Sequence, residues 1–191
     1  MIGRYKPYIV FVAFVAVGLT AIFLVSEGYY PVLLVEGEFI SVRRFSKDYR
    51  AASLYYENFL RTYGGETNEE KLEPKEIQLS VLEQLVEDVL VRQEMERRVG
   101  RDADALIANK IEKFKSDENL GEAVTALYGF SLADFEREVL IPQAEREVLM
   151  GRLFLDGEKI EVWLEGAKKS ASVMTFSSAF HWKDGKMEEA K

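Results

Sequence analysis

The sequence predicts a mainly helical protein built around one long amphipathic helix over residues 75–100. Pro74 stands just before this segment and Gly100 ends it, which are the positions where these residues favour the start and the end of a helix. A single helix cannot shield a broad apolar stripe, so we expect other helices to pack on it. The stripe follows three- and four-residue spacing through Ile77, Val81, Leu82, Leu85, Val86, Val89, Leu90 and Met95.

The composition narrows the classes of function. The chain has 191 residues, of which 48% are hydrophobic, and this is enough to bury a core. Its net charge of −8 argues against nucleic acid as a partner, because binding to phosphates favours a basic surface. The chain has no cysteine and one histidine, His181, so disulfides, thiolate metal sites and sites that need two imidazoles are excluded. We therefore expect neither a cofactor nor a metal site.

The N-terminal segment predicts a transmembrane signal anchor over residues 8–26. Residues 8–25 carry no charge and would span about 27 Å as a helix. Arg4 and Lys6 before the run and Glu27 after it place residues 1–7 in the cytoplasm and the rest outside, as a single-pass protein of the cell membrane. The lipid bilayer is thus one expected partner. A cleaved signal peptide is the alternative, although residues 24–28 form a poor cleavage site.

The first part of the domain predicts a strand, a turn and a long helix. Residues 31–40 favour a strand and a short second arm joined by a turn at Glu36 and Gly37. Ser41 is placed to cap a helix that begins at Val42. Residues 62–75 predict a polar loop, and short helices follow the central one, the first with Phe114 on its inner face and the next ended by Gly129.

The last part predicts two further helices, a strand and a tail. Ser131 and Asp134 form a capping box for a helix over residues 132–154, which Pro142 should kink or divide into two helices in series. A helix over 159–169 and a strand over 172–176 follow. We expect residues 32–35 to pair with residues 173–176 as a two-stranded ribbon that joins the start and end of a domain spanning residues 31–176. Residues 177–191 are interpreted as a C-terminal tail that ends in a charged, frayed stretch.

Aromatic residues and methionines supply a candidate surface for apolar peptide, because they offer large and adaptable contact area. For each of them, an ordinary place in the core is the competing interpretation. The acidic pairs in the sequence diverge around their helices, and nothing converges on a nucleophile with its base, so we expect no enzyme. The candidate peptide-binding residues are Tyr55, Tyr56, Phe59, Met95, Tyr128, Phe130, Met150 and Phe154.

Several motifs, in this order, resemble the N-terminal chaperone domain of the SurA and PrsA foldases, which are often fused to a parvulin prolyl isomerase. Residues 35–41, VEGEFIS, are similar to the family's V-N-G-E-x-I-[ST] opening, with Glu36 in place of asparagine. Residues 81–90 resemble its L-x-x-L-I-x-x-x-L-L helix. Residues 128–135, YGFSLADF, resemble its Y-G-[LM]-[ST] helix start. The closing helix and strand are matched by Trp163 and by residues 171–173.

The resemblance implies an extracytoplasmic chaperone that binds unfolded or newly translocated polypeptides. Only residues 155–158 lie where the family's parvulin domain commonly intervenes, and parvulin chemistry draws on a pair of histidines, so we expect no isomerase activity. A second hypothesis is an adaptor module of a cell-envelope complex, which would use the same surface for one folded partner. An adaptor should present one broad apolar patch, whereas a chaperone should present a groove with a polar rim.

Overall fold

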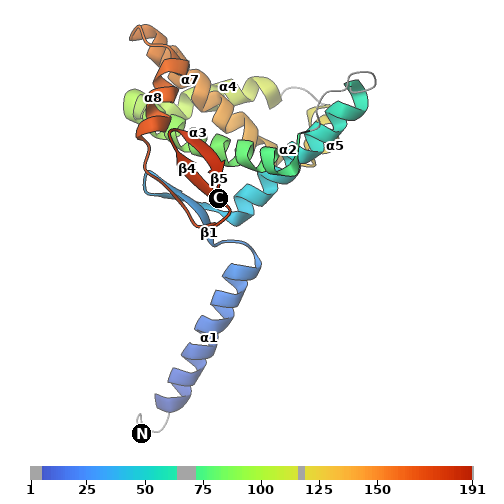
Figure 1. Cartoon of the computed structure of the whole chain (residues 1–191), viewed down its shortest axis with the longest axis vertical. Coiled ribbons are helices and arrows are strands. Elements are labelled where there is room, and N and C mark those ends of the chain that lie inside the picture. The colour runs from blue at the N-terminus through green and yellow to red at the C-terminus, as the bar shows by residue number, and fades with distance from the viewer. Residues whose placement is uncertain (1–5, 64–71, 116–118, 191) are drawn as a thin grey trace.

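The predicted central helix is α3, Pro74–Val99, and several other helices pack on it in this computed structural model, which describes residues 6–63, 72–115 and 119–190 (Figure 1). Pro74 occupies the first turn, and the Glu73 N–H donates to Glu76 Oε2 at 2.7 Å within a capping box. Gly100 follows the helix with φ 68°, a backbone conformation that favours glycine. The prediction for this helix is confirmed, and its buried residues are Val81, Leu82, Leu85, Val86, Val89, Leu90, Val91 and Met95.

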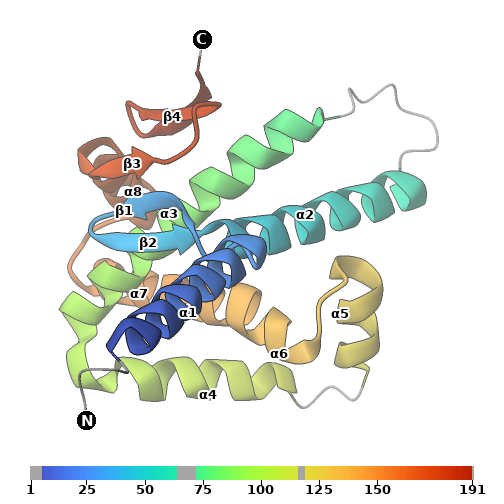
Figure 2. The same ribbon diagram turned by 90° about the horizontal axis from the view of Figure 1, so that it is seen from below.

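Helices cover α3 on several sides (Figure 2). The helix α2, Val42–Tyr63, begins at the predicted cap, where Ser41 Oγ accepts the Arg44 N–H at 3.3 Å. After a 3-10 turn, Gly100–Asp102, come α4, Ala103–Lys115, and α5, Leu120–Tyr128. The predicted inner-face residue Phe114 on α4 is 47% exposed, so that prediction is wrong. Much of the predicted loop over residues 62–75, and part of the break after α4, lie outside the described residues.

The late helix is continuous but widened in the middle. It comprises α6, Leu132–Phe135, a π-helical turn, Glu136–Leu140, and α7, Ile141–Leu155. Ser131 Oγ accepts the Asp134 N–H at 3.1 Å, which confirms the predicted cap. Pro142 lies in the first turn of α7, directly after the π-helical turn. A π-helical turn thus interrupts the regular α-helix directly before this proline, and the predicted kink stays a prediction.

The strands at the two ends of the domain pair as predicted, but the sheet has three strands. β1, Pro31–Val35, pairs antiparallel with β3, Val173–Thr175, and Leu34 faces Met174. The second arm, β2, Glu38–Ser41, pairs with the other edge of β1, with Leu34 opposite Phe39. The predicted two-stranded ribbon is corrected to a sheet of order β2-β1-β3. The third strand shields a side of β1 that a ribbon would leave open.

The C-terminal segment is folded and not frayed. After α8, Ile160–Ser170, and β3, the chain forms an antiparallel hairpin of β4, Phe180–Lys183, and β5, Lys186–Glu189. Met187 is 5% exposed and belongs to the same core cluster as α3 and the three-stranded sheet, and Trp182 packs against that cluster. The tail prediction over residues 177–191 is thus wrong for residues 180–189, because alternate side chains of a short hairpin reach the core.

The N-terminal helix α1, Lys6–Ser26, projects away from the rest of the protein (Figure 1). Its described apolar side chains are exposed, and Phe14 reaches 80% exposure. Within residues 6–63, 72–115 and 119–190, no helix meets the length and apolarity needed to cross a membrane. The predicted transmembrane span over residues 8–26 therefore stays a prediction.

Candidate functional site

Aromatic rings form a stack where α2 meets α5. The rings of Tyr55 and Tyr128 lie 5.1 Å apart between centroids, with planes 6° apart. Tyr128 also contacts Phe130 at 6.4 Å and Phe135 at 5.4 Å. Asn58 on α2 donates to the Ala126 carbonyl at 3.1 Å, which fixes the end of α5 against α2. The aromatic stack is thus attached to both helices.

The stack borders an apolar cleft of about 280 Å³ between α2, α3 and α5. Its apolar lining includes Ala51 and Ala52 from α2 together with Val81 and Leu85 from α3. The alanines leave space beside the helices, and the α3 side chains supply a buried floor. Tyr55, 45% exposed, stands at the edge of the cleft. The remaining lining residues are Asp48, Gln84, Asp88, Tyr128, Phe130, Glu138 and Val139.

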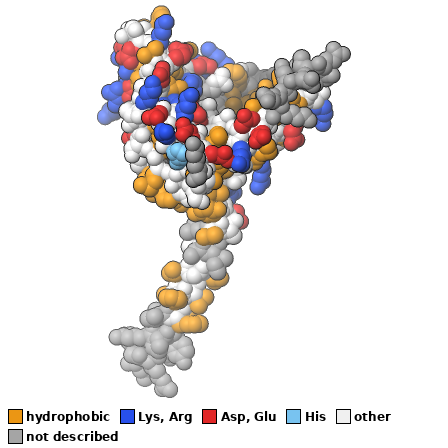
Figure 3. Space-filling view, viewed as in Figure 1, with side chains coloured by type: hydrophobic (Ala, Val, Ile, Leu, Met, Phe, Trp, Pro, Cys, Tyr) orange, Lys and Arg blue, Asp and Glu red, His pale blue; other side chains and the backbone are white. Residues whose placement is uncertain are grey.

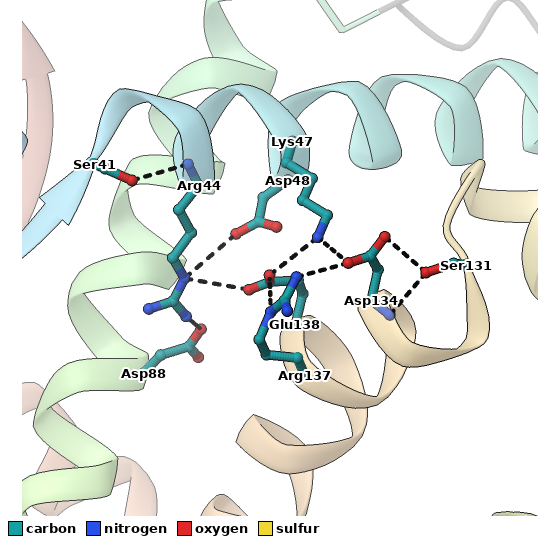
Figure 4. A network of polar contacts seen from close by, with 9 residues as sticks. All are labelled: Ser41, Arg44, Lys47, Asp48, Asp88, Ser131, Asp134, Arg137 and Glu138. Carbon is teal, nitrogen blue, oxygen red and sulfur yellow. Dashed lines mark hydrogen bonds and ion pairs between the residues drawn. The ribbon is translucent and has the colours of Figure 1, made fainter. Parts of the chain in front are cut away.

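The polar part of the lining joins a network of ion pairs between α2, α3 and the π-helical turn (Figure 4). Arg44 lies at its centre: its Nη2 is 3.5 Å from Asp88 Oδ2, and its Nε is 3.4 Å from Glu138 Oε2. Lys47 pairs with Asp134 and lies 3.4 Å from Glu138 Oε1. The Glu138 side chain is only 7% exposed. These pairs hold the three segments that line the cleft in fixed positions.

Burial raises the pKa values of several side chains in and near the cleft. It raises the pKa of Asp48 to about 7, and repulsion from Glu138 adds to the effect. Burial likewise raises the pKa of Asp88, and that of Glu145 on α7 to about 7. The Tyr128 hydroxyl also has a raised pKa because of burial and of its neighbour Tyr55. On the wall of the cleft, the Asp48 carboxyl group is therefore only partly ionised near neutral pH.

A second, more polar cleft of about 710 Å³ lies on the other side of α2, where α1 meets the domain. Arg43, Lys47 and Arg50 contribute positive charge to it, and Glu27 and Asp134 contribute negative charge. Phe130 and Tyr128 line both clefts, so they separate the two spaces. Within the described ranges, no group of three or more histidine, aspartate or glutamate side chains could hold a metal ion.

The structure brings three of the predicted peptide-binding residues together. Tyr55, Tyr128 and Phe130 line the apolar cleft, although Phe130 is 6% exposed and acts as wall. Tyr56 and Phe59 lie on α2 outside the lining, and the Tyr56 hydroxyl accepts the Leu72 N–H at 2.8 Å.

The other three predicted residues lie elsewhere. Met95 is 1% exposed and belongs to the core, so its predicted place on the surface is wrong. It follows the buried stripe of α3, which already indicates a core position. Met150 and Phe154 are exposed on α7, away from the cleft lining.

Sequence reasoning missed the small residues Ala51 and Ala52 and the α3 floor. The pattern of α3 indicates only a core position for Val81 and Leu85, because periodicity shows that a residue faces other helices and not that a gap is left above it. The alanines on α2 opposite a long apolar stripe are the signal that could have indicated the space.

The comparison with family models identifies residues 8–138 as a SurA-like N-terminal domain. The match extends from α1 into the π-helical turn and includes every residue that lines the apolar cleft except Val139. The chain belongs to this family. The predicted resemblance to this family is thereby confirmed, and the predicted closing motif at Trp163 and residues 171–173 lies outside the matched residues. As a SurA-like N-terminal domain, the protein is a chaperone or protein-interaction module, and domains of this kind bind polypeptides. Comparisons with curated proteins and with solved structures found no match.

Proposed function

We propose that this protein is a holdase, a chaperone that binds unfolded polypeptide and keeps it from aggregating, and that it binds its clients in the cleft between α2, α3 and α5. The observation that carries the proposal is an open apolar cleft edged by the Tyr55–Tyr128 pair in a SurA-like domain. Unfolded chains expose apolar side chains. Binding becomes favourable when a cleft removes these side chains from water. Binding of this kind needs neither a covalent step nor a cofactor.

The size and lining of the cleft favour promiscuous clients. Its volume of about 280 Å³ can hold a few side chains of an extended segment and not a folded domain. Tyrosine gives a rigid apolar surface with a polar edge, which suits contacts with varied sequences. The carboxyl groups of Asp48, Asp88 and Glu138 form a polar border on one side. A groove with a polar border is the feature expected of a chaperone rather than of an adaptor.

The proposed activity does not include prolyl isomerisation. The chain passes from α7 to α8 through the short segment 156–159, where the related foldases commonly carry their parvulin domain. Its one histidine, His181, lies on β4 with Nε2 3.5 Å from Glu188 Oε2 on the C-terminal hairpin. Neither residue of this pair lines the apolar cleft. A coupled assay of proline isomerisation in a short peptide should show the uncatalysed rate.

The placement that the sequence predicts is also part of the proposal: a domain on the outer side of the cell membrane, attached through the N-terminal segment. It is supported by the uncharged run of residues 8–25 and by the exposure of the apolar side chains described on α1, such as Phe11 at 67%. Newly translocated polypeptides would then be the clients. Protease treatment of sealed cells should remove the domain, whereas protection of the domain until lysis would contradict this placement.

A direct test of the holdase activity uses the full chain in mild detergent. A chemically denatured, aggregation-prone protein is diluted into it, and light scattering is followed over time. We expect scattering to be suppressed at stoichiometric amounts, and suppression to weaken several-fold for the Tyr55→Ser variant. Phe154→Ser is the matched control, because Phe154 is a 78% exposed aromatic residue on a helix outside the cleft. No suppression by the natural chain at several-fold excess would favour the adaptor hypothesis.

A further inference from the structure

The outer face of the three-stranded sheet carries a row of apolar side chains. Leu34 on β1 lies opposite Phe39 on β2 and opposite Met174 on β3, so the three side chains share one face. Phe176 continues this row: its N–H donates to the Val32 carbonyl at 3.0 Å, and its ring lies 6.2 Å from that of Phe39. We call these four residues the outer sheet face.

This face is open to solvent while the opposite side of the same strands is core. Phe39 is 65% exposed, Met174 57% and Phe176 49%. Leu33 and Val35, which flank Leu34, and Ile40, which follows Phe39, are at most 1% exposed. A sheet with one solvated face ordinarily places polar residues there. A contiguous apolar cluster on that face indicates a surface that another apolar phase covers.

The outer sheet face lies close to the point where α1 leaves the domain. Only residues 27–30 separate α1 from β1. Figure 1 shows the sheet at the edge of the domain from which α1 projects, and the space-filling view shows hydrophobic side chains gathered there above the helix (Figure 3). The exposed apolar surface of α1 and that of the sheet are therefore neighbours on one side of the molecule.

Several contacts fix α1 to the domain at this point. The Arg43 N–H donates to the Gly28 carbonyl at 2.8 Å, and the Val42 N–H donates to the Tyr30 carbonyl at 2.9 Å. The Arg43 guanidinium donates to the Tyr29 hydroxyl at 2.7 Å and lies 3.3 Å from Glu27. The connection is thus short and held by hydrogen bonds from the start of α2. Whatever covers the apolar surface of α1 must therefore lie close to the three-stranded sheet.

We propose that the outer sheet face docks on the surface of a lipid bilayer. The inference rests on the membrane placement proposed above and adds a second contact that orients the domain. Exposed Phe39, Phe176, Tyr29 and Tyr30 supply the aromatic rings that partition into the interface of a bilayer. None of the four residues of the face is charged, so the docking depends on buried apolar area and needs no anionic lipid. The apolar cleft, which is not part of this face, is then held near the membrane and open to emerging chains.

The test uses the full chain in phosphatidylcholine vesicles and exploits its lack of cysteine. Single substitutions Met174→Cys and Phe39→Cys place a fluorescent label on the outer sheet face. Val162→Cys is the matched control, because Val162 is 68% exposed on α8, which begins at the end of the domain away from α1. Phe14→Cys reports on α1. Each label is quenched by iodide in water or by nitroxide-labelled lipid, and client binding is measured separately by light scattering.

We expect the ratio of lipid to iodide quenching to be several-fold higher at positions 174 and 39 than at position 162. Equal access of iodide to all three positions, with the label at 14 in lipid, would overturn the docking and leave the anchor intact. Shielding of 174 and 39 from both quenchers would show that protein, such as a second copy of the chain, covers the face. A label at 14 that is quenched only by iodide would overturn both the placement and the docking. Quenching does not report on the suppression of aggregation, which light scattering measures separately. A failure of the docking can therefore be told apart from a failure of the holdase function.

Discussion

The ring of Tyr55 on α2 lies parallel to the ring of Tyr128 on α5, with 5.1 Å between their centroids. The two residues are far apart in sequence, and the pair joins helices at the edge of the apolar cleft. Tyr55 is exposed, while Tyr128 lies deeper and also contacts Phe130 and Phe135. Tyr55 can therefore be changed with less effect on the core than Tyr128.

Replacement of Tyr55 should separate client binding from stability. Tyr55→Ala removes the exposed half of the stack, so we expect the affinity for a fluorescent apolar peptide to fall about 5- to 30-fold, which corresponds to about 1–2 kcal/mol. Tyr55→Phe keeps the ring and should retain most of the affinity. Fluorescence anisotropy measures both variants. Equal affinity of Tyr55→Ala and the natural chain would mean that the peptide binds elsewhere.

The two methionines among the predicted peptide-binding residues should differ in how much they contribute to stability. Met95 is 1% exposed and packs with Val91 and Leu149, so Met95→Ala should lower the free energy of unfolding by about 2–5 kcal/mol. Met150 is 48% exposed, and Met150→Ala should change it by less than about 0.5 kcal/mol. Urea titration followed by circular dichroism gives both values. Similar small changes for the two variants would contradict the assignment of Met95 to the core.

The buried carboxyl groups predict a pH dependence of stability. Burial raises the pKa values of Asp48 and Glu145 to about 7, whereas an unfolded carboxyl group titrates near 4. Between about pH 4 and pH 7 the folded state then binds more protons than the unfolded state. Its free energy of unfolding should fall as pH rises through that window, by on the order of 1 kcal/mol or more.

The double variant Asp48→Asn with Glu145→Gln removes these two titrating groups. Its free energy of unfolding should therefore fall less as pH rises from about 4 to 7. Glu122→Gln, at an exposed glutamate on α5, is the control and should leave the decline in place. Thermal unfolding at half-unit steps of pH measures the effect. Stability of the natural chain that increases from pH 5 to pH 8 would be inconsistent with protonated buried carboxyl groups.

Two glycines should respond oppositely to alanine. Gly185 turns the C-terminal hairpin with φ 83°, and an added Cβ would lie 3.3 Å from the Lys169 backbone nitrogen of α8. Gly185→Ala should cost about 1–2 kcal/mol of stability. Gly166 lies inside α8 with open space around it, so Gly166→Ala should stabilise the protein by about 0.5–1 kcal/mol. Chemical denaturation compares the two. A neutral Gly185→Ala would indicate that the hairpin is not packed against α8.

The sequence allowed prediction of those elements whose signals are local. The stripe of α3, the Ser41 and Ser131 caps and the end of α5 at Gly129 all follow from neighbouring residues, and the structure has each of them. The pairing of β1 with β3 was also predictable, because two isolated apolar strands had no other partner in the expected helical domain.

The C-terminal hairpin and the apolar cleft depend on contacts between distant segments. The hairpin contributes one buried residue, Met187, within a charged segment, and this is too weak a pattern to indicate a strand. The cleft is lined by the small side chains of Ala51 and Ala52 on α2 and by Val81 and Leu85 on α3, and hydrophobic periodicity does not reveal that space is left beside them. The ion pairs of Arg44 join α2 to α3 and to the π-helical turn, so no local spacing could indicate them.

The most direct test of the proposed function is photo-crosslinking from the cleft itself. A benzophenone amino acid replaces Tyr55 in one preparation of the full chain and Phe154 in another, and each is irradiated with a denatured client and with the same client in its native state. We predict crosslinks from position 55 to the denatured client only, and at most weak crosslinks from position 154. Equal crosslinking from both positions, or crosslinking of the native client from position 55, would contradict a cleft that selects unfolded polypeptide.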